Sequence, residues 1–105
     1  MIFKCACEKP PFNYLDYKTT NLGEDNNGAE VSIDHCKKCG SNWVKYLIEE
    51  PHYSNSGRWW RAILSEPALS ADIAKEYIQS REWCFIGGSF HNSTGKKVYA
   101  PITIT

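Results

Sequence analysis

The sequence of 105 residues lacks the features of several broad classes of protein. It has no excess charge of either sign, with 12 Lys and Arg against 12 Asp and Glu, whereas dedicated nucleic-acid binders usually carry a basic surplus. No apolar run approaches the roughly 18 residues of a transmembrane helix. Aromatic residues make up 13% of the chain, which excludes disorder over most of its length. We therefore expect a single folded domain over residues 1–105.

Motifs of the common enzyme classes are missing as well. The sequence contains no Walker phosphate loop, no G-x-S-x-G nucleophile elbow and no H-E-x-x-H zinc motif. Its three histidines have no spacing that suits metal ligands or a general base. Gly87-Gly88-Ser89 could cradle an anion through backbone N–H groups, but a strand bend or bulge is the commoner role of such glycines. We expect a protein that is not an enzyme.

Cysteine is abundant for a small chain whose N-terminal residues do not resemble a secretion signal. Met1 to Cys7 has neither the basic start nor the apolar stretch of a secretion signal, so we expect a cytoplasmic protein. In a reducing cytoplasm, cysteines serve as metal ligands more often than as disulfide partners. The sequence holds five of them: Cys5, Cys7, Cys36, Cys39 and Cys84.

Four of these cysteines have the spacing of a structural zinc site. Cys5 and Cys7 form a C-x-C pair, while Cys36 and Cys39 form a C-x-x-C pair that is followed by Gly40. Zinc favours four such soft ligands in a tetrahedron, and four thiolates leave no open position for catalysis. The arrangement resembles a zinc ribbon over residues 5–40, although the first pair is C-x-C where C-x-x-C is usual. We expect Zn²⁺ as a structural cofactor.

Other roles for the cysteines and their neighbours remain open. A C-x-x-C pair can be a redox centre, but no strand–helix context of the thioredoxin kind surrounds Cys36 and Cys39. His35 could replace one cysteine as a ligand. Cys84 lies in the apolar run from Trp83 to Ile86, so we expect a buried core residue rather than a nucleophile.

The hydrophobic pattern predicts an α+β fold, a small antiparallel sheet of hairpins with one main helix on one face. The helix is expected at about residues 66–81, opened by Ser65 or by Ser70. Its core-facing stripe is Leu69, Ile73, Tyr77 and Ile78. Strands are expected at residues 2–7, 31–34, 43–48, 58–64, 82–90 and 97–103, with a polar loop at 21–28, a turn at 91–95 and a zinc-ribbon-like part at about 1–42.

The chain as a whole resembles the small immunity proteins of bacterial polymorphic-toxin and contact-dependent inhibition systems. The resemblance lies in the cysteine pairs near the start, in Arg58-Trp59-Trp60-Arg61, and in the run Phe85 to Ser89 ahead of a Gly95-Lys96-Lys97 turn. It implies a protein that binds and neutralises one cognate toxin domain, usually by covering the active site of the toxin.

Tight protein interfaces are anchored by Trp, Tyr and Arg in a desolvated centre. Adjacent strand residues point to opposite faces, so one of Trp59 and Trp60 is expected in the core and the other on the second face. The candidate partner-binding residues are Tyr53, Arg58, Trp59, Trp60 and Arg61, together with the acidic Glu24, Asp25, Glu30 and Asp34, which could also form a solvated loop.

A zinc-ribbon protein that binds nucleic acid or is associated with transcription is the alternative. Exposed aromatic side chains beside Lys37, Lys38 and Lys45 could stack on bases. The zero net charge and the acidic segment at residues 24–34 count against it.

Overall fold

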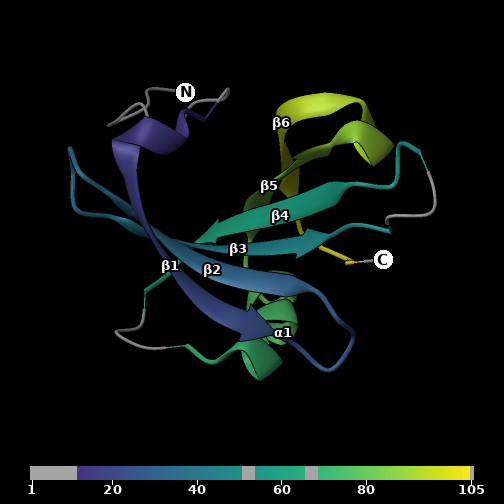
Figure 1. Ribbon diagram of the computed structural model, residues 1–105, viewed down its shortest axis with the longest axis horizontal. Helices are drawn as coiled ribbons and strands as arrows, with labels where there is room; N and C mark the ends of the chain where they lie inside the picture. Colours follow the sequence, from purple (N-terminus) through teal and green to yellow (C-terminus); the bar gives the residue numbers. More distant parts are fainter. Residues whose placement is uncertain (1–11, 51–53, 66–68, 105) are drawn as a thin grey trace.

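The computed structural model describes residues 12–50, 54–65 and 69–104, which form an antiparallel sheet with a short helix on one face (Figure 1). The six strands in these ranges lie side by side in their sequence order. This confirms the predicted α+β class. The strands are β1 (Tyr17–Glu24), β2 (Glu30–Cys36), β3 (Asn42–Ile48), β4 (Arg58–Ile63), β5 (Trp83–Gly88) and β6 (Ser93–Tyr99), and the helix is α1 (Ala74–Gln79).

The β3–β4 hairpin is where the sequence predicted it. Its register pairs Trp43 with Ile63 and Ile48 with Arg58. Both strands are rich in aromatic and branched residues, which fit a pleated surface that is buried on both sides. The hairpin therefore forms the centre of the sheet.

The expected loop at residues 21–28 is wrong at its beginning, because β1 continues to Glu24 and residues 25–29 connect it to β2. Along β1 only Tyr17 is buried and Leu22 is half-buried. An edge strand with so few inward-facing apolar residues gives little hydrophobic periodicity, so it has the sequence pattern of a loop. The predicted strand at residues 2–7 lies outside the described residues.

The helix is shorter than predicted. A 3-10 turn, η3 (Ala71–Ile73), leads into α1, and Ser70 precedes this turn without a side-chain capping bond. Ala71, Ala74 and Ile78 face the sheet, whereas 46% of Ile73 is exposed. The small alanines allow a close approach to the sheet, so the predicted stripe is wrong at Ile73.

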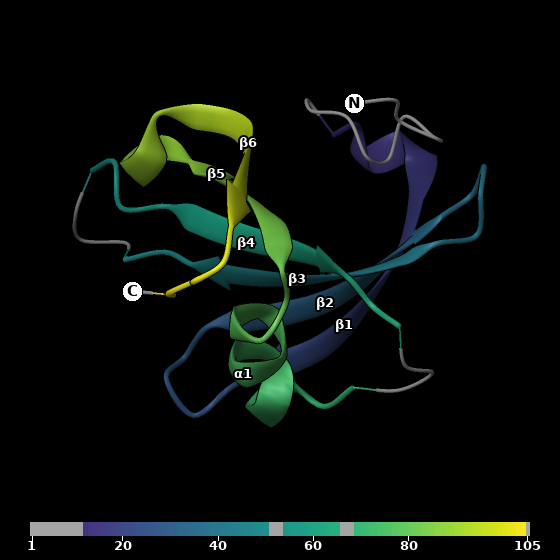
Figure 2. The ribbon, with the colours of Figure 1, turned by 180° about the vertical axis from the view of Figure 1, so that it is seen from behind.

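The β5–β6 connection differs from the predicted turn at residues 91–95. A 3-10 turn, η4 (Ser89–His91), follows β5, and β6 begins already at Ser93. The register shifts between Ile86 and Gly88, which confirms the expected irregularity in the glycine-containing strand. Strand β6 ends at Tyr99, ahead of Pro101. The chain then returns toward α1 (Figure 2). There the N–H of Ile104 donates to the side-chain oxygen of Gln79 over 2.9 Å.

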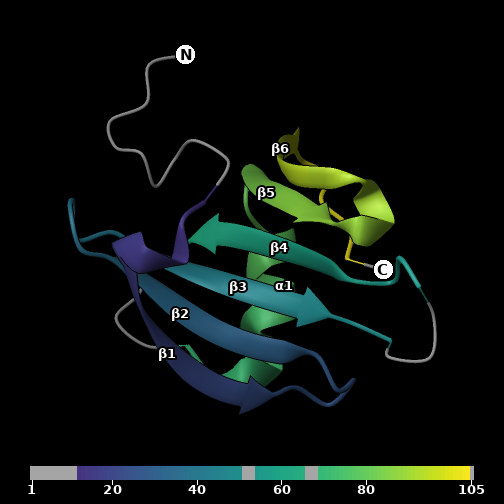
Figure 3. The ribbon, with the colours of Figure 1, turned by 45° about the horizontal axis from the view of Figure 1, so that its top comes forward.

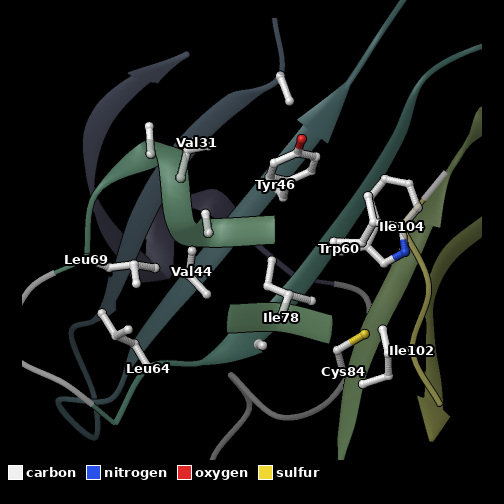
Figure 4. Packing of buried hydrophobic residues seen from close by; sticks show 14 residues of the cluster. Val31, Val44, Tyr46, Trp60, Leu64, Leu69, Ile78, Cys84, Ile102 and Ile104 are labelled. Carbon is white, nitrogen blue, oxygen red and sulfur yellow. The ribbon is translucent and has the colours of Figure 1, made fainter. Parts of the chain in front are cut away.

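The main hydrophobic core lies between the sheet and α1 (Figure 4). Trp60 and Tyr46 are each 1% exposed and make an edge-to-face contact with ring centres 6.3 Å apart. The thiol of Cys84 lies in the same cluster, and burial raises its pKa to about 12. Cys84 is 0% exposed, which confirms that it is a core residue.

A second cluster lies on the opposite face of the sheet. We call this face, which turns away from α1 in Figure 3, the open face. The name covers the outward side of β3, β4 and β5, with Trp43 and Lys45, Trp59 and Arg61, and Phe85. No described helix packs there. Instead Tyr17, at the start of β1, and the half-buried Phe12 cover part of it.

None of the helices in the described part of the chain has the length and apolar composition that crossing a membrane requires.

Candidate functional site

A pocket of about 580 Å³ opens on the open face of the sheet. It lies between the start of β1, at Tyr17, and the segment around η4, at Ser89 and Asn92. Small-molecule and anchor pockets in proteins commonly measure about 300–1,000 Å³. Strand β4 contributes Trp59 and Arg61, and β3 contributes Lys45.

The indole of Trp59 occupies space that a side chain on the next strand would otherwise fill. It pairs across strands with Gly87, and a Cβ at that position would collide with the indole. The indole is half-buried and contacts Phe12 edge-to-face, with ring centres 5.9 Å apart. The role of Gly87 is therefore to make room for Trp59.

Arg61 is buried beside the pocket by aromatic rings, with only 3% of its surface exposed. Its guanidinium carbon lies 4.1 Å from the ring centre of Phe12, 4.3 Å from that of Tyr17 and 4.7 Å from that of Trp43. A guanidinium is attracted to aromatic faces and is always charged in proteins. The contacts fix the direction of the side chain without neutralising its charge.

The hydrogen-bonding capacity of Arg61 is unused in the described part of the chain. Its Nε and Nη2 atoms are buried and have no acceptor among these residues, and the same holds for the indole nitrogen of Trp43. Buried polar groups are satisfied in the great majority of cases, so orphaned donors require an explanation. All three unpaired atoms are hydrogen-bond donors, so what this cluster lacks is acceptors.

Lys45 and Asp34 set the charge of the pocket. Lys45 is half-buried, and its ammonium lies 6.0 Å from the ring centre of Trp59. Asp34 is 9% exposed, and its carboxylate accepts a hydrogen bond of 2.7 Å from the hydroxyl of Thr19. With Arg61, the three charged side chains give a formal excess of one positive charge.

The structure separates the partner-binding residues that the sequence suggested around β4. Trp60 lies in the core with α1, and Trp59 lies on the open face, which settles which of the two is accessible. Arg58 is half-buried, donates to the carbonyl of Ser56 over 2.7 Å and lies over the ring of Phe90. Tyr53 lies outside the described residues.

The four acidic candidates do not share one environment. Glu24 and Glu30 are exposed as a cross-strand pair at the end of the β1–β2 hairpin. Asp25 organises the turn, where its carboxylate accepts hydrogen bonds from the hydroxyl of Tyr46 and from the N–H of Ala29. Asp34 faces the pocket instead.

The electrostatics of Asp25 follow from these bonds. Burial alone raises the pKa of its carboxyl, but the bonds from Tyr46 and the backbone outweigh this effect and lower the pKa below the ordinary value of 3.8. Burial and the bond to Asp25 in turn raise the pKa of the Tyr46 hydroxyl to about 12. Asp25 thus connects the turn between β1 and β2 to Tyr46 on β3.

The second cysteine pair lies in the turn between β2 and β3. The N–H of Gly40 donates to the carbonyl of Cys36 over 2.9 Å, and Gly40 has a positive φ of 79°. A glycine adopts this left-handed conformation without steric cost, so the backbone turns tightly around the cysteines. Cys36 is buried and Cys39 is exposed.

The start of the described chain is attached to this turn. The N–H of Lys37 donates to the carbonyl of Asp16 over 3.0 Å, and the ammonium of Lys37 lies 3.3 Å from the carbonyl of Leu15. Cys7 precedes Leu15 by eight residues. Cys5 and Cys7 therefore precede the attached segment closely in the sequence and lie outside the described residues.

The turn presents its two thiols in different surroundings, because Cys36 lies in the hydrophobic cluster of the open face whereas Cys39 is exposed. Among residues 12–50, 54–65 and 69–104 no group of three or more candidate ligands gathers, and Cys5 and Cys7 lie outside these ranges. His35 is exposed on β2, where its Nδ1 atom lies 2.8 Å from the Asn42 side-chain oxygen.

No protein-family model matches the chain, and no match to it is found among curated proteins or solved structures.

Sequence reasoning did not connect Phe12 and Tyr17 with β4. The available signal was their position in an aromatic segment, but their contact with Arg61 depends on the path of β1 along the sheet edge. The alternation of Trp43, Lys45 and Leu47 on one side of β3 places Lys45 on the open face, and this could have been predicted.

Proposed function

We propose that this chain is a small cytoplasmic protein-binding module, stabilised by structural zinc, that binds and neutralises a bacterial toxin domain. The open face of the sheet would be its contact surface. This proposal combines the resemblance to immunity proteins with the character of that face.

The observation that carries the proposal is the position of Trp59. Its half-buried indole lies at a pocket, with Lys45 beside it and Arg61 behind it. Tryptophan and arginine are enriched at the centres of protein interfaces, and tryptophan offers a large contact area at little cost in side-chain entropy. Gly87 and Phe12 fix the indole before binding, which further reduces the entropy lost on association.

Binding of nucleic acid is less well supported. Arg61 is buried among aromatic rings and does not form part of an extended basic surface. Asp34 lies in the same pocket, and a phosphate backbone would be repelled by this carboxylate. The exposed Glu24 and Glu30 add negative charge at the end of the neighbouring hairpin.

Zinc would stabilise the edge of the open face at the turn between β2 and β3. The turn at Cys36 and Cys39 connects β2 to β3, and Lys37 in this turn binds the segment that leads into β1. Zinc held there supplies a covalent-like crosslink between segments distant in sequence. Cys36 pairs with Tyr17 across the strands, so the crosslink would also position one of the rings around Arg61.

Capture of a partner from cells of the source organism tests the proposal. A tagged wild-type chain is washed at low and then at high salt, and bound protein and nucleic acid are measured separately. We expect one protein to remain at high salt and to be a toxin domain whose activity the chain inhibits. Recovery of nucleic acid that is lost at high salt would instead favour the alternative, since phosphate contacts depend strongly on salt.

A further inference from the structure

Arg61 and the pocket beside it define a candidate binding site. Arg61 is 3% exposed, and two of its guanidinium nitrogens have no acceptor in the described part of the chain. The aromatic rings around it attract its charge, but its Nε and Nη2 atoms donate no hydrogen bond in this part of the chain. An arginine in this state beside a pocket is suited to receive an anion.

The chemistry of the pocket narrows the choice of anion. Arg61 and Lys45 supply two positive charges, and Asp34 removes one. A monoanion neutralises the remaining positive charge, whereas a phosphate dianion would leave an excess negative charge close to Asp34. The planar fork of a guanidinium also matches the two oxygens of a carboxylate.

The walls of the pocket indicate what the carboxylate is attached to. Phe12, Tyr17 and Trp59 present aromatic surface, while Ser89, Asn92 and Thr94 offer polar groups from the other side. A flat apolar body can stack against Trp59 while its charged end faces Arg61. The pocket volume of about 580 Å³ accommodates a molecule of one or two rings.

We infer that the open-face pocket binds a small aromatic carboxylate, with Arg61 and Lys45 as the charge partners and Trp59 as the stacking surface. This site goes beyond the proposed function, because it requires no protein partner. Arg61 and Lys45 line the pocket, so a carboxylate bound there would lie beside both positive charges.

Benzoate is the probe for the test, with benzamide as the neutral isostere and inorganic phosphate as the competing anion, all at constant ionic strength. Unfolding temperature and Trp fluorescence of the full chain are followed during titration. At ten times its Kd, benzoate should raise Tm by about 5–10 °C. Benzamide and phosphate should have much smaller effects. Equal shifts with benzamide and benzoate, or no shift with benzoate, would overturn the inference.

Two variants locate the site. Arg61→Met keeps the length of the side chain and should abolish the benzoate shift. Lys45→Gln lies on half-buried surface and should weaken benzoate binding about tenfold while the chain stays folded. If Arg61→Met does not fold, unchanged affinity in Lys45→Gln still contradicts the assignment. Because these titrations contain no protein partner, their result is independent of the capture experiment.

Discussion

Trp59 and Trp60 are adjacent in sequence, yet their side chains lie in different clusters on opposite faces of the sheet. Trp60 packs beneath α1 with 1% of its surface exposed, and Trp59 packs against Phe12 on the open face. The alternation of a β-strand is the cause. One residue therefore serves stability, while the other is available for binding.

Alanine substitutions should separate these two roles. Trp60→Ala leaves a large cavity in the main core and should lower the free energy of unfolding by about 3–5 kcal/mol. Trp59→Ala should cost only about 1–2 kcal/mol, because the indole is half-buried. Chemical denaturation of both variants checks this, and equal losses would contradict the assignment of the two faces.

Gly88 and Gly28 form a second matched pair. Both have positive φ, 112° and 80° respectively, but a Cβ on Gly88 would collide with the backbone of Gly57 and Arg58, whereas Gly28 has open space around it. Gly88→Ala should destabilise the chain by about 2–4 kcal/mol and Gly28→Ala by about 1 kcal/mol. Thermal unfolding measures the difference. Similar losses of stability in both variants would contradict this prediction, because they would show that only the positive φ, and not the collision, destabilises the chain.

His91 should make the fold sensitive to mild acid. Burial, with the nearby charge of Arg58, lowers the pKa of its imidazole below the ordinary 6.5, and its Nε2 atom has no acceptor in the described chain. The unfolded state therefore binds a proton more readily, so this contribution to stability is lost as pH falls below about 6.5. His91→Gln should flatten the dependence of Tm on pH between about 7 and 5. An unchanged slope would contradict this account.

The cysteine turn predicts a metal dependence. Wild-type protein should contain zinc, and Cys36→Ser should release it and lower Tm by more than about 10 °C. Cys84→Ala, in the core away from the turn, is the control and should keep the metal. Metal analysis and calorimetry give both values. A wild-type protein without zinc, whose melting does not change in Cys36→Ser, would end the zinc hypothesis.

The parts of the fold that follow from local pattern could be predicted from the sequence. The β3–β4 hairpin was predicted because two runs rich in aromatic and branched residues, 43–48 and 58–64, flank a turn-rich segment. Strand β1 was not, because an exposed edge with only Tyr17 buried has no such signal. The helix was predicted too long, since its packing depends on Ala71 and Ala74, whose small size gives little hydrophobic periodicity.

The candidate site was predictable only in part. Strand geometry predicted that Trp59 and Trp60 lie on opposite faces of the sheet. Because both side chains are apolar, the sequence did not show which of them faces the core, and the position of α1 was needed to decide this. The burial of Arg61 depends on Phe12 and Tyr17, which approach it only through the folded sheet. An arginine in the sequence gives no indication that aromatic rings will enclose it.

The most direct test of the account measures the affinity of the captured partner for three forms of the chain. These are the wild type, Trp59→Ala on the open face, and Ile73→Ala, which removes an exposed apolar side chain near α1. Titration calorimetry should show a loss of at least about 30-fold for Trp59→Ala, in the range of an interface hot spot, and no change for Ile73→Ala. Equal affinity of the wild type and Trp59→Ala would contradict the claim that the open face is the binding surface.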